Sequence, residues 1–154
     1  HPGIDALALA HFLETNPSTL RYHLFTLLRA EKITAFSRPG VVRYYPNQGM
    51  YSPFLQCLLH SLWTDTRREI IVLLWHTPGM TRTQLAVALA CSGPSVTRQM
   101  QGLAEDGIVE NRGTGRSNHY HLTTAAVEAL GILGPMAGSL ALPALAAPAL
   151  PSAA

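Results

Sequence analysis

Two stretches of the sequence place hydrogen-bonding side chains directly after a helix-start signal. Each signal is a cap residue with a proline close behind it, at Asn16-Pro17 and at Ser92-Gly93-Pro94. The side chains that follow are Ser18, Thr19, Arg21 and Tyr22 in the first stretch, and Ser95, Thr97, Arg98 and Gln101 in the second. Hydroxyl, amide and guanidinium groups of this kind bind phosphate oxygens and base edges. The chemistry they predict is noncovalent recognition of a polyanion.

The charge and the apolar spacing of both stretches agree with that chemistry. No acidic residue occurs in residues 16–30 or 92–104, and acids resume at Glu31 and at Glu105. Helix N-termini add free N–H groups that favour phosphate. Apolar residues at i, i+4 and i+7 spacing are expected to face inward. They are Leu20, Leu24, Leu27 and Leu28 in the first helix, and Val96, Met100 and Leu103 in the second.

The elements that must position these helices occur twice. A shift of 76 residues lays Pro2-Gly3 on Pro78-Gly79 and Tyr44 on Tyr120 without a gap, and it also aligns leucines of the helices. A chance match of two alanine- and leucine-rich amphipathic stretches is the alternative. The Pro-Gly pair and the tyrosine lie outside the helical pattern, so we interpret the match as an internal repeat.

Each copy predicts two helices and a hairpin. The first helices are expected over 5–14 and 81–90, capped by Asp5 and Thr81, the second helices over 16–30 and 92–106, and the hairpins over 33–45 and 108–122, each with glycine in its turn. Another helix precedes the second copy, and Thr66 and Glu69 have capping-box spacing at its start. The matching helix of the first copy would lie before His1. Because the chain begins without methionine, we expect an upstream part to be missing.

The order helix, helix, turn, helix, hairpin is that of a winged helix. In this helix-turn-helix variant the helix after the turn enters the major groove, and the hairpin contacts the backbone or minor groove. The eight side chains named first are therefore candidate DNA-binding residues. Wing candidates are Arg38 and Arg43 in the first copy, and Arg112, Arg116, Asn118 and His119 in the second. The alternative is that these side chains are ordinary solvated surface.

The fold class expected is mainly α with small β-hairpin wings, as two tandem winged-helix domains joined by a helix. The expected boundaries are 1–48 for the first domain, 49–63 for a linker helix, 64–133 for the second domain and 134–154 for a tail rich in alanine, leucine and proline. Prolines interrupt the tail, so disorder is expected there and a membrane-associating segment is the less favoured interpretation.

The segments "PSTLRYHL", "RYY" and "TRTQLAVALACSGPSVTRQMQGLAEDGIVENRG" resemble winged helix-turn-helix transcriptional regulators of the ArsR/MarR type, particularly the tandem versions common in archaea. The resemblance covers about residues 1–130. It implies DNA binding as dimers or tandem units, with recognition helices at 17–29 and 94–105 and wings at 34–45 and 109–122. The cysteine pairs of metal-sensing members are absent, so metal sensing is not expected.

Neither the composition of the sequence nor its motifs indicate an enzyme. Paired carboxylates in a cleft pattern, a Ser/His/Asp arrangement and a glycine-rich phosphate loop are all missing from the sequence. No cofactor or metal is expected, since His119-x-His121 has no third ligand and the two cysteines, Cys57 and Cys91, form no C-x-x-C pair. Free cysteines suit a reducing compartment, and we expect a cytoplasmic protein.

The function expected is sequence-specific, DNA-binding transcriptional regulation, with double-stranded DNA as the partner and no small-molecule substrate evident. A net charge of +2 is low for such a protein. The alternative is therefore a tandem winged-helix scaffold for protein–protein interaction that does not bind nucleic acid. A homodimer is also expected, through the apolar helices at 54–62 and 64–76 with Trp63 and Trp75 as anchors.

Overall fold

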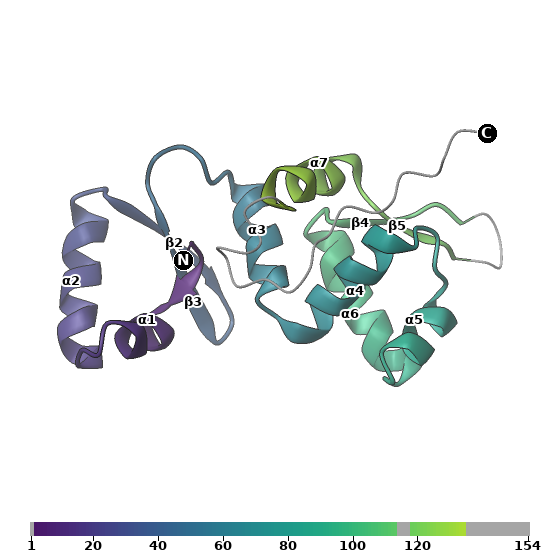
Figure 1. Ribbon diagram of the computed structural model, residues 1–154, viewed down its shortest axis with the longest axis horizontal. Coiled ribbons are helices and arrows are strands. Elements are labelled where there is room, and N and C mark those ends of the chain that lie inside the picture. The colour runs from purple at the N-terminus through teal and green to yellow at the C-terminus, as the bar shows by residue number, and fades with distance from the viewer. Residues whose placement is uncertain (1, 114–117, 135–154) are drawn as a thin grey trace. The chain divides into compact units, whose positions relative to one another are not determined.

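The computed structural model of the protein describes residues 2–113 and 118–134. The expected wing residue Arg116 and the expected tail beyond Gly134 lie outside these residues. The chain divides into two units, His1–His60 and Ser61–Ala154 (Figure 1). The division falls inside a helix, α3 (Pro53–Leu62), which sequence analysis assigned to a separate linker.

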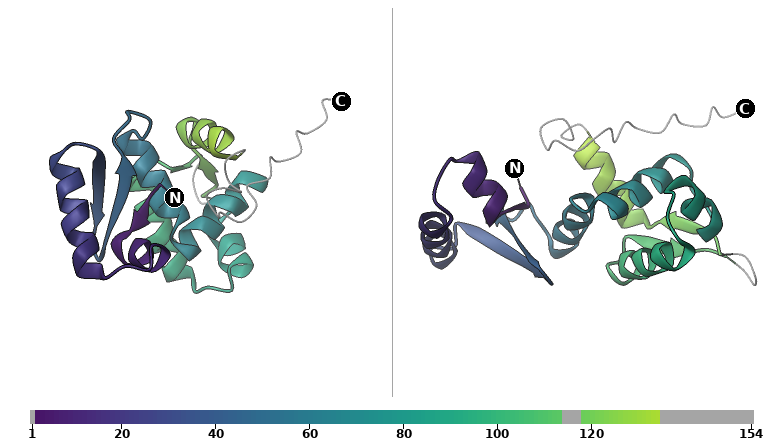
Figure 2. Two further views of the ribbon diagram at one scale, coloured as in Figure 1. Left: turned by 60° about the vertical axis from the view of Figure 1, so that its left-hand side comes forward. Right: turned by 90° about the horizontal axis from the view of Figure 1, so that it is seen from below.

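The first unit combines two helices with a small antiparallel sheet. Its elements are β1 (Ile4–Asp5), α1 (Ala6–Phe12), α2 (Pro17–Arg29), β2 (Ile33–Arg38) and β3 (Val41–Pro46), followed by α3. The sheet has the order β1-β3-β2, and α1 and α2 lie beside it in both views of Figure 2. The hairpin β2–β3 matches the predicted wing, whereas β1, which pairs Ile4 with Tyr44, was not predicted.

Side-chain caps fix where the two helices of the first unit begin. The Asp5 carboxylate accepts a hydrogen bond from the Ala8 amide at 2.9 Å, and the Asn16 side chain accepts one from the Ser18 amide at 2.8 Å. Both predicted caps are confirmed. The helix α1 ends earlier than residue 14, because Glu14 has a φ of 49° and cannot continue a right-handed helix.

The first unit contains a small hydrophobic cluster. Its buried members are Ala10, Leu20 and Leu24, with Ala6, Leu9, Ile33 and Tyr44 packed against them. Tyr45, Leu58 and Leu59 are buried apart from this cluster. Leu27, which sequence analysis expected to face inward, is 40% exposed. Its counterpart in the second unit, Leu103, is fully buried.

The second unit carries a fuller set of helices around a two-stranded hairpin. Its elements are α4 (Asp65–His76), α5 (Arg82–Ala88), α6 (Gly93–Glu105), β4 (Val109–Asn111), β5 (Tyr120–Leu122) and α7 (Thr124–Leu133). The helix α4 packs against α6 and β5, and α5 packs against α6. The buried side chains include Ile70, Ile71, Leu74, Leu85, Val96, Met100, Leu103, Ile108, Leu122 and Leu130.

The predicted capping box at the start of α4 is wrong. Thr66 and Glu69 lie inside the helix, which begins at Asp65 after Thr64. A capping box is present instead at α5, where Thr81 and Gln84 exchange side-chain hydrogen bonds with each other's backbone amides. The helix α7, capped by Thr123, was not predicted as an element.

Backbone details of the first unit recur 76 residues later. The amide of Gly3 donates to the Tyr44 carbonyl at 3.0 Å, and that of Gly79 donates to the Tyr120 carbonyl at 2.9 Å. Both glycines have positive φ, 81° and 85°, which explains the Pro-Gly pair that the sequence repeats. Positive φ also recurs after each first helix, at Glu14 and at Ala90 with 49° in both.

The turn between the second helix and the hairpin recurs in the same way. The amide of Lys32 donates to the Leu27 carbonyl, and that of Ile108 donates to the Leu103 carbonyl, each at 2.9 Å. The residue before each donor, Glu31 or Gly107, has positive φ.

Candidate nucleic-acid interface

The helix α6 separates its apolar and polar side chains onto opposite faces. Val96, Met100 and Leu103 are at most 3% exposed and form its inner face. The four residues that sequence analysis selected are exposed and lie on the outer face: Ser95, Thr97, Arg98 and Gln101. The predicted helix is therefore present, and it offers these four residues to a partner.

Hydrogen bonds at the start of α6 distinguish the roles of the four residues. The Ser92 hydroxyl accepts the Ser95 amide, and the Thr97 hydroxyl donates to the Gly93 carbonyl at 2.9 Å. Within the described part of the chain, the side chains of Arg98 and Gln101 have no hydrogen-bond partner. These two long side chains are the groups of α6 that are ready for an external ligand.

An arginine from α4 fixes the position of α6. Arg67 Nε donates to Gln99 Oε1 at 3.1 Å, and Arg67 Nη1 donates to Asp106 Oδ2 at 3.1 Å. Gly102 leaves room for this arginine, because a Cβ atom there would collide with Arg67 Nη2. Sequence analysis did not select Arg67 or Gln99, since nothing in the repeat pattern indicates a side chain that reaches from α4 to α6.

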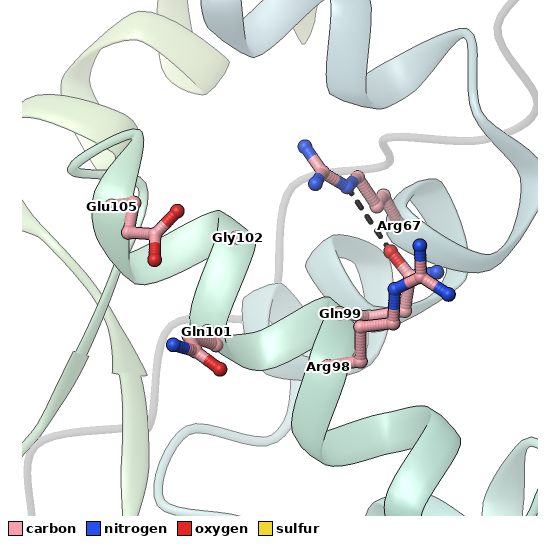
Figure 3. A pocket seen from close by; sticks show the side chains of 6 residues that line it. All are labelled: Arg67, Arg98, Gln99, Gln101, Gly102 and Glu105. Carbon is pink, nitrogen blue, oxygen red and sulfur yellow. Dashed lines mark hydrogen bonds between the residues drawn. The ribbon is translucent and has the colours of Figure 1, made fainter. Parts of the chain in front are cut away.

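These residues surround an open hollow of about 510 Å³ (Figure 3). Its lining is Arg67, Arg98, Gln99, Gln101, Gly102 and Glu105. Figure 3 shows the hydrogen bond between Arg67 and Gln99 and the side chains of Arg98, Gln101 and Glu105 on α6. Glu105 brings a negative charge to the end of the helix, so the favourable part for a polyanion is the N-terminal half of α6.

The wing of the second unit holds part of its polar groups in internal contacts. Arg112 forms an ion pair with Glu110 at 2.6 Å, and Asn118 Oδ1 accepts a hydrogen bond from Asn111 at 2.9 Å. His119 Nδ1 lies 2.9 Å from the Gly79 carbonyl oxygen. All three candidates are nevertheless exposed at the residue level.

In the first unit the expected helix residues are also exposed. Ser18, Thr19, Arg21 and Tyr22 lie on the outer side of α2, away from the buried Leu20 and Leu24. Sequence analysis missed two exposed neighbours, Phe25 and Arg29, which continue the same side of the helix. The signal for them was the helical spacing from Tyr22.

Arg43 is a structural residue of the first unit and not part of its surface. Its side chain is 8% exposed, and its Nη1 donates to the Gly3 carbonyl at 2.9 Å. Its Nε donates to His60 Nδ1 at 3.3 Å, and burial lowers the pKa of the guanidinium. The expectation of a DNA contact at Arg43 is corrected, because the alternating pattern of β3 turns this residue inward.

Arg38 is half-buried at the end of β2. Its Nη2 lies 3.5 Å from the Cys57 sulfur, and its guanidinium carbon lies 5.2 Å from the centre of the Phe36 ring. The guanidinium of Arg38 thus already contacts other side chains of the first unit.

Two further properties concern the described residues only. None of the helices in residues 2–113 and 118–134 is long and apolar enough to cross a membrane. The same residues contain no cluster of three histidine, cysteine or acidic side chains with the geometry of a metal site.

The family described as "Winged helix-turn-helix DNA-binding" matches residues 64–110. No curated protein matches the sequence significantly. Among solved structures, HlyU from Vibrio cholerae is similar with 20% identity and a TM-score of 0.49, covering 58% of this chain and 97% of that chain. A DNA complex of MepR from S. aureus is similar with 19% identity and a TM-score of 0.48, covering 56% of this chain and 73% of that chain.

A third similar structure is the homodimeric winged helix-turn-helix domain of Mb0332 from Mycobacterium bovis, described as a possible ArsR-family regulator. It has 21% identity and a TM-score of 0.48, covering 58% of this chain and 82% of that chain. The residues that match the family contain α4, α5, α6 and the start of β4, and this order of elements is consistent with one winged-helix domain.

Proposed function

We propose that the protein is a DNA-binding transcriptional regulator, of the ArsR/MarR type that its sequence resembles. Its second unit reads double-stranded DNA, with α6 in the major groove and the β4–β5 wing on the backbone or minor groove. The observation that carries this proposal is the outer face of α6. Arg98 and Gln101 stand there exposed and without a partner among the described residues, on a helix with no acidic side chain before Glu105.

The side chains on α6 are assigned to different parts of the DNA according to their chemistry. Ser95 lies in the first turn, where its hydroxyl and the nearby free amides suit a phosphate. Arg98 and Gln101 are long enough to reach base edges, and their planar ends suit guanine and adenine respectively. Thr97, whose hydroxyl is bonded to Gly93, is assigned an apolar contact through its methyl group.

The wing supplies weaker contacts in this proposal. Arg112 would exchange its partner Glu110 for a phosphate, and Asn118 and His119 would approach the backbone from the same hairpin. Because Glu110 competes for Arg112, we expect the wing to contribute less affinity than α6 does.

The first unit is proposed to be a winged helix as well, related to the second unit by duplication and divergence. The 76-residue recurrence of the turn glycines, the positive φ values and the backbone hydrogen bonds supports this. Its α2 helix then corresponds to α6. DNA contacts by Ser18, Thr19, Arg21, Tyr22 and Arg38 stay predictions, and Arg43 is left out because it is buried.

Homodimer formation is also part of the proposal, although α3, one of the two helices expected to provide the interface, has little free apolar surface. Leu58, Leu59 and Leu62 of α3 are at most 1% exposed, and Trp63 and Trp75 are half-buried. Sedimentation equilibrium tests the proposal: a single species of monomer mass at high protein concentration contradicts it.

Fluorescence anisotropy with a labelled duplex, at several salt concentrations, tests DNA binding. Wild-type protein should bind with an affinity that falls steeply with salt, and Arg98→Ala should weaken binding by about 1–3 kcal/mol if the contact is to a base. Arg68→Ala is the matched control, since Arg68 is paired to Asp65 on α4 and lies outside the proposed surface. Equal losses in both variants, or no binding at low salt, would count against the proposal.

A scaffold function is the second candidate for the first unit, because the outer side of α2 carries two exposed aromatic rings.

A further inference from the structure

Five exposed residues form a stripe along α2. Each of these residues lies three or four positions from another of the set, so they share one side of the helix: Ser18, Arg21, Tyr22, Phe25 and Arg29. Tyr22 is 68% exposed and Phe25 is 58% exposed. We call these five residues the α2 stripe. An exposed pair of large rings on one helix face is unusual enough to indicate an interaction site.

The equivalent side of α6 has different chemistry. With the 76-residue shift, Tyr22 and Phe25 correspond to Arg98 and Gln101, and Arg29 corresponds to Glu105. Where the second unit offers polar groups to a ligand, the first unit offers aromatic rings. The two helices are thus suited to different partners.

Cationic groups accompany both rings. The Arg29 guanidinium carbon lies 5.9 Å from the centre of the Phe25 ring, a cation–π arrangement that holds the charge beside the apolar surface. Arg21 lies one residue before Tyr22 and is exposed. No acidic residue occurs in α2. The α2 stripe therefore joins an apolar centre to two positive charges.

We propose that the α2 stripe binds an acidic amphipathic helix of another protein. Apolar side chains of that helix pack against Tyr22 and Phe25, and its carboxylates pair with Arg21 and Arg29. This mode of binding uses the same i, i+3, i+4 spacing on both helices. The inference rests on the proposed function in that α6 of the second unit binds the duplex, and it replaces the duplex contacts predicted for Arg21 and Tyr22 of α2.

Two other occupants fit the α2 stripe less well, one because of the stripe's charges and the other because of its aromatic rings. A second copy of the chain, docked through the same stripe, would bring like charges together on both helices. The phosphates of duplex DNA would pair with the arginines, but they would offer no apolar partner to the exposed Phe25 ring. An acidic helix with apolar anchors satisfies both the charges and the rings.

The test uses the full chain and four fluorescent probes measured by anisotropy. The first probe is a synthetic helical peptide of about four turns, with leucine at i and i+4 positions and glutamate elsewhere. The second replaces glutamate by lysine, and the third replaces leucine by alanine. The fourth is a single-stranded oligothymidine. Only the first peptide should bind well, and its affinity should fall moderately as salt is raised.

Two double variants locate the site. Tyr22→Ser with Phe25→Ser, and Arg21→Ala with Arg29→Ala, should each weaken binding of the acidic peptide about tenfold or more. Arg98→Ala should leave it unchanged. All substituted side chains are exposed, so a thermal melt should confirm that each variant folds. Arg21→Lys with Arg29→Lys should retain most of the affinity for the peptide.

Three results would overturn the inference: no binding of the acidic peptide, equal binding of the lysine peptide, or preferential binding of oligothymidine through the same residues. Duplex binding is measured on the same samples. If α2 variants lose the peptide while Arg98→Ala alone loses the duplex, both proposals stand. If the peptide binds and the duplex does not, the proposed function fails while the α2 inference survives.

Discussion

Arg67 of α4 and Asp106, the residue that caps the C-terminus of α6, are joined by an ion pair with 3.1 Å between Nη1 and Oδ2. The two side chains are 20% and 10% exposed. The pair joins α4 to the C-terminal end of α6, the helix that is proposed to read DNA. Since Gly102 leaves the space that the guanidinium occupies, one glycine and one ion pair together set the position of α6.

Arg67→Ala should lower the free energy of unfolding by about 1–3 kcal/mol, because it leaves a mostly buried carboxylate without its charged donor. Chemical denaturation monitored by circular dichroism measures the change. Arg68→Ala is the control: its partner Asp65 is 84% exposed, so the loss should be at most about 1 kcal/mol. A loss at Arg68 as large as that at Arg67 contradicts the assignment.

Thr81→Ala should destabilise the protein by about 1 kcal/mol, because it removes the side chain that caps α5 and half of the box with Gln84. Thr83→Ala provides the comparison, since Thr83 is exposed within the same helix and makes no cap. Thermal unfolding of the two variants side by side gives the answer. A Thr83 variant less stable than the Thr81 variant would show that the cap matters little.

The stability of the first unit should fall as the pH rises from 10 to 12. Burial raises the pKa of Tyr45 from its ordinary value of 10.0 to about 12, and its hydroxyl donates to the Gln56 carbonyl at 3.3 Å. Between these pH values the unfolded chain loses the phenolic proton while the folded chain keeps it, so the equilibrium shifts toward unfolding. Denaturation at pH 9, 10, 11 and 12 measures the slope.

Tyr45→Phe should flatten that slope, because phenylalanine has no proton to lose. Ultraviolet absorbance offers a second readout, in which the phenol of Tyr45 in the folded wild type ionises only near its raised pKa of about 12. The same slope in Tyr45→Phe would assign the alkaline instability to other groups.

Arg43→Met should destabilise the first unit by about 1–3 kcal/mol, because the Gly3 carbonyl loses a charged donor in a buried position. It should not change the salt dependence of duplex binding, since a buried guanidinium cannot release counterions from DNA. Unfolding curves and salt titrations of the same preparation test both statements. A shallower salt dependence of duplex binding by Arg43→Met than by wild type would indicate that Arg43 contacts DNA.

The local elements could be predicted from the sequence because their signals are local. Four helices begin at N-cap residues whose side chains accept hydrogen bonds from amides two or three residues away: Asp5, Asn16, Thr81 and Ser92. The mainly helical class with small hairpins is likewise confirmed by the order of the elements. Capping spacing alone was misleading at Thr66, since α4 already begins at Asp65.

Contacts between distant residues could not be predicted in the same way. The strand β1 spans two residues, and its pairing with Tyr44 depends on the turn at Gly3 and not on any strand pattern. Arg43 looked like a wing cation, but whether a strand residue faces inward depends on the register with its neighbours. Arg67 meets Asp106 across 39 positions of sequence, which no periodicity reveals.

The candidate site was predicted in its helices and less well in its details. The exposed positions on α2 and α6 follow from the spacing of the apolar residues, which marks the opposite face of each helix. Phe25 and Arg29 were missed because a recognition helix is expected to place its contacts in its first turns, and these two residues lie farther along α2. The internal contacts of Arg112 and Asn118 depend on hairpin geometry, which the sequence does not specify.

The central claim is that α6 reads base sequence, and selection of duplexes from a random library by the full chain tests it most directly. Wild-type protein should enrich a defined site, and Gln101→Ala should relax the preference at one position of that site while retaining binding. Gln48→Ala, at an exposed glutamine that follows β3 in the first unit, serves as the control and should leave the selected site unchanged. Failure to enrich any sequence, or an identical site for wild type and Gln101→Ala, would contradict the account.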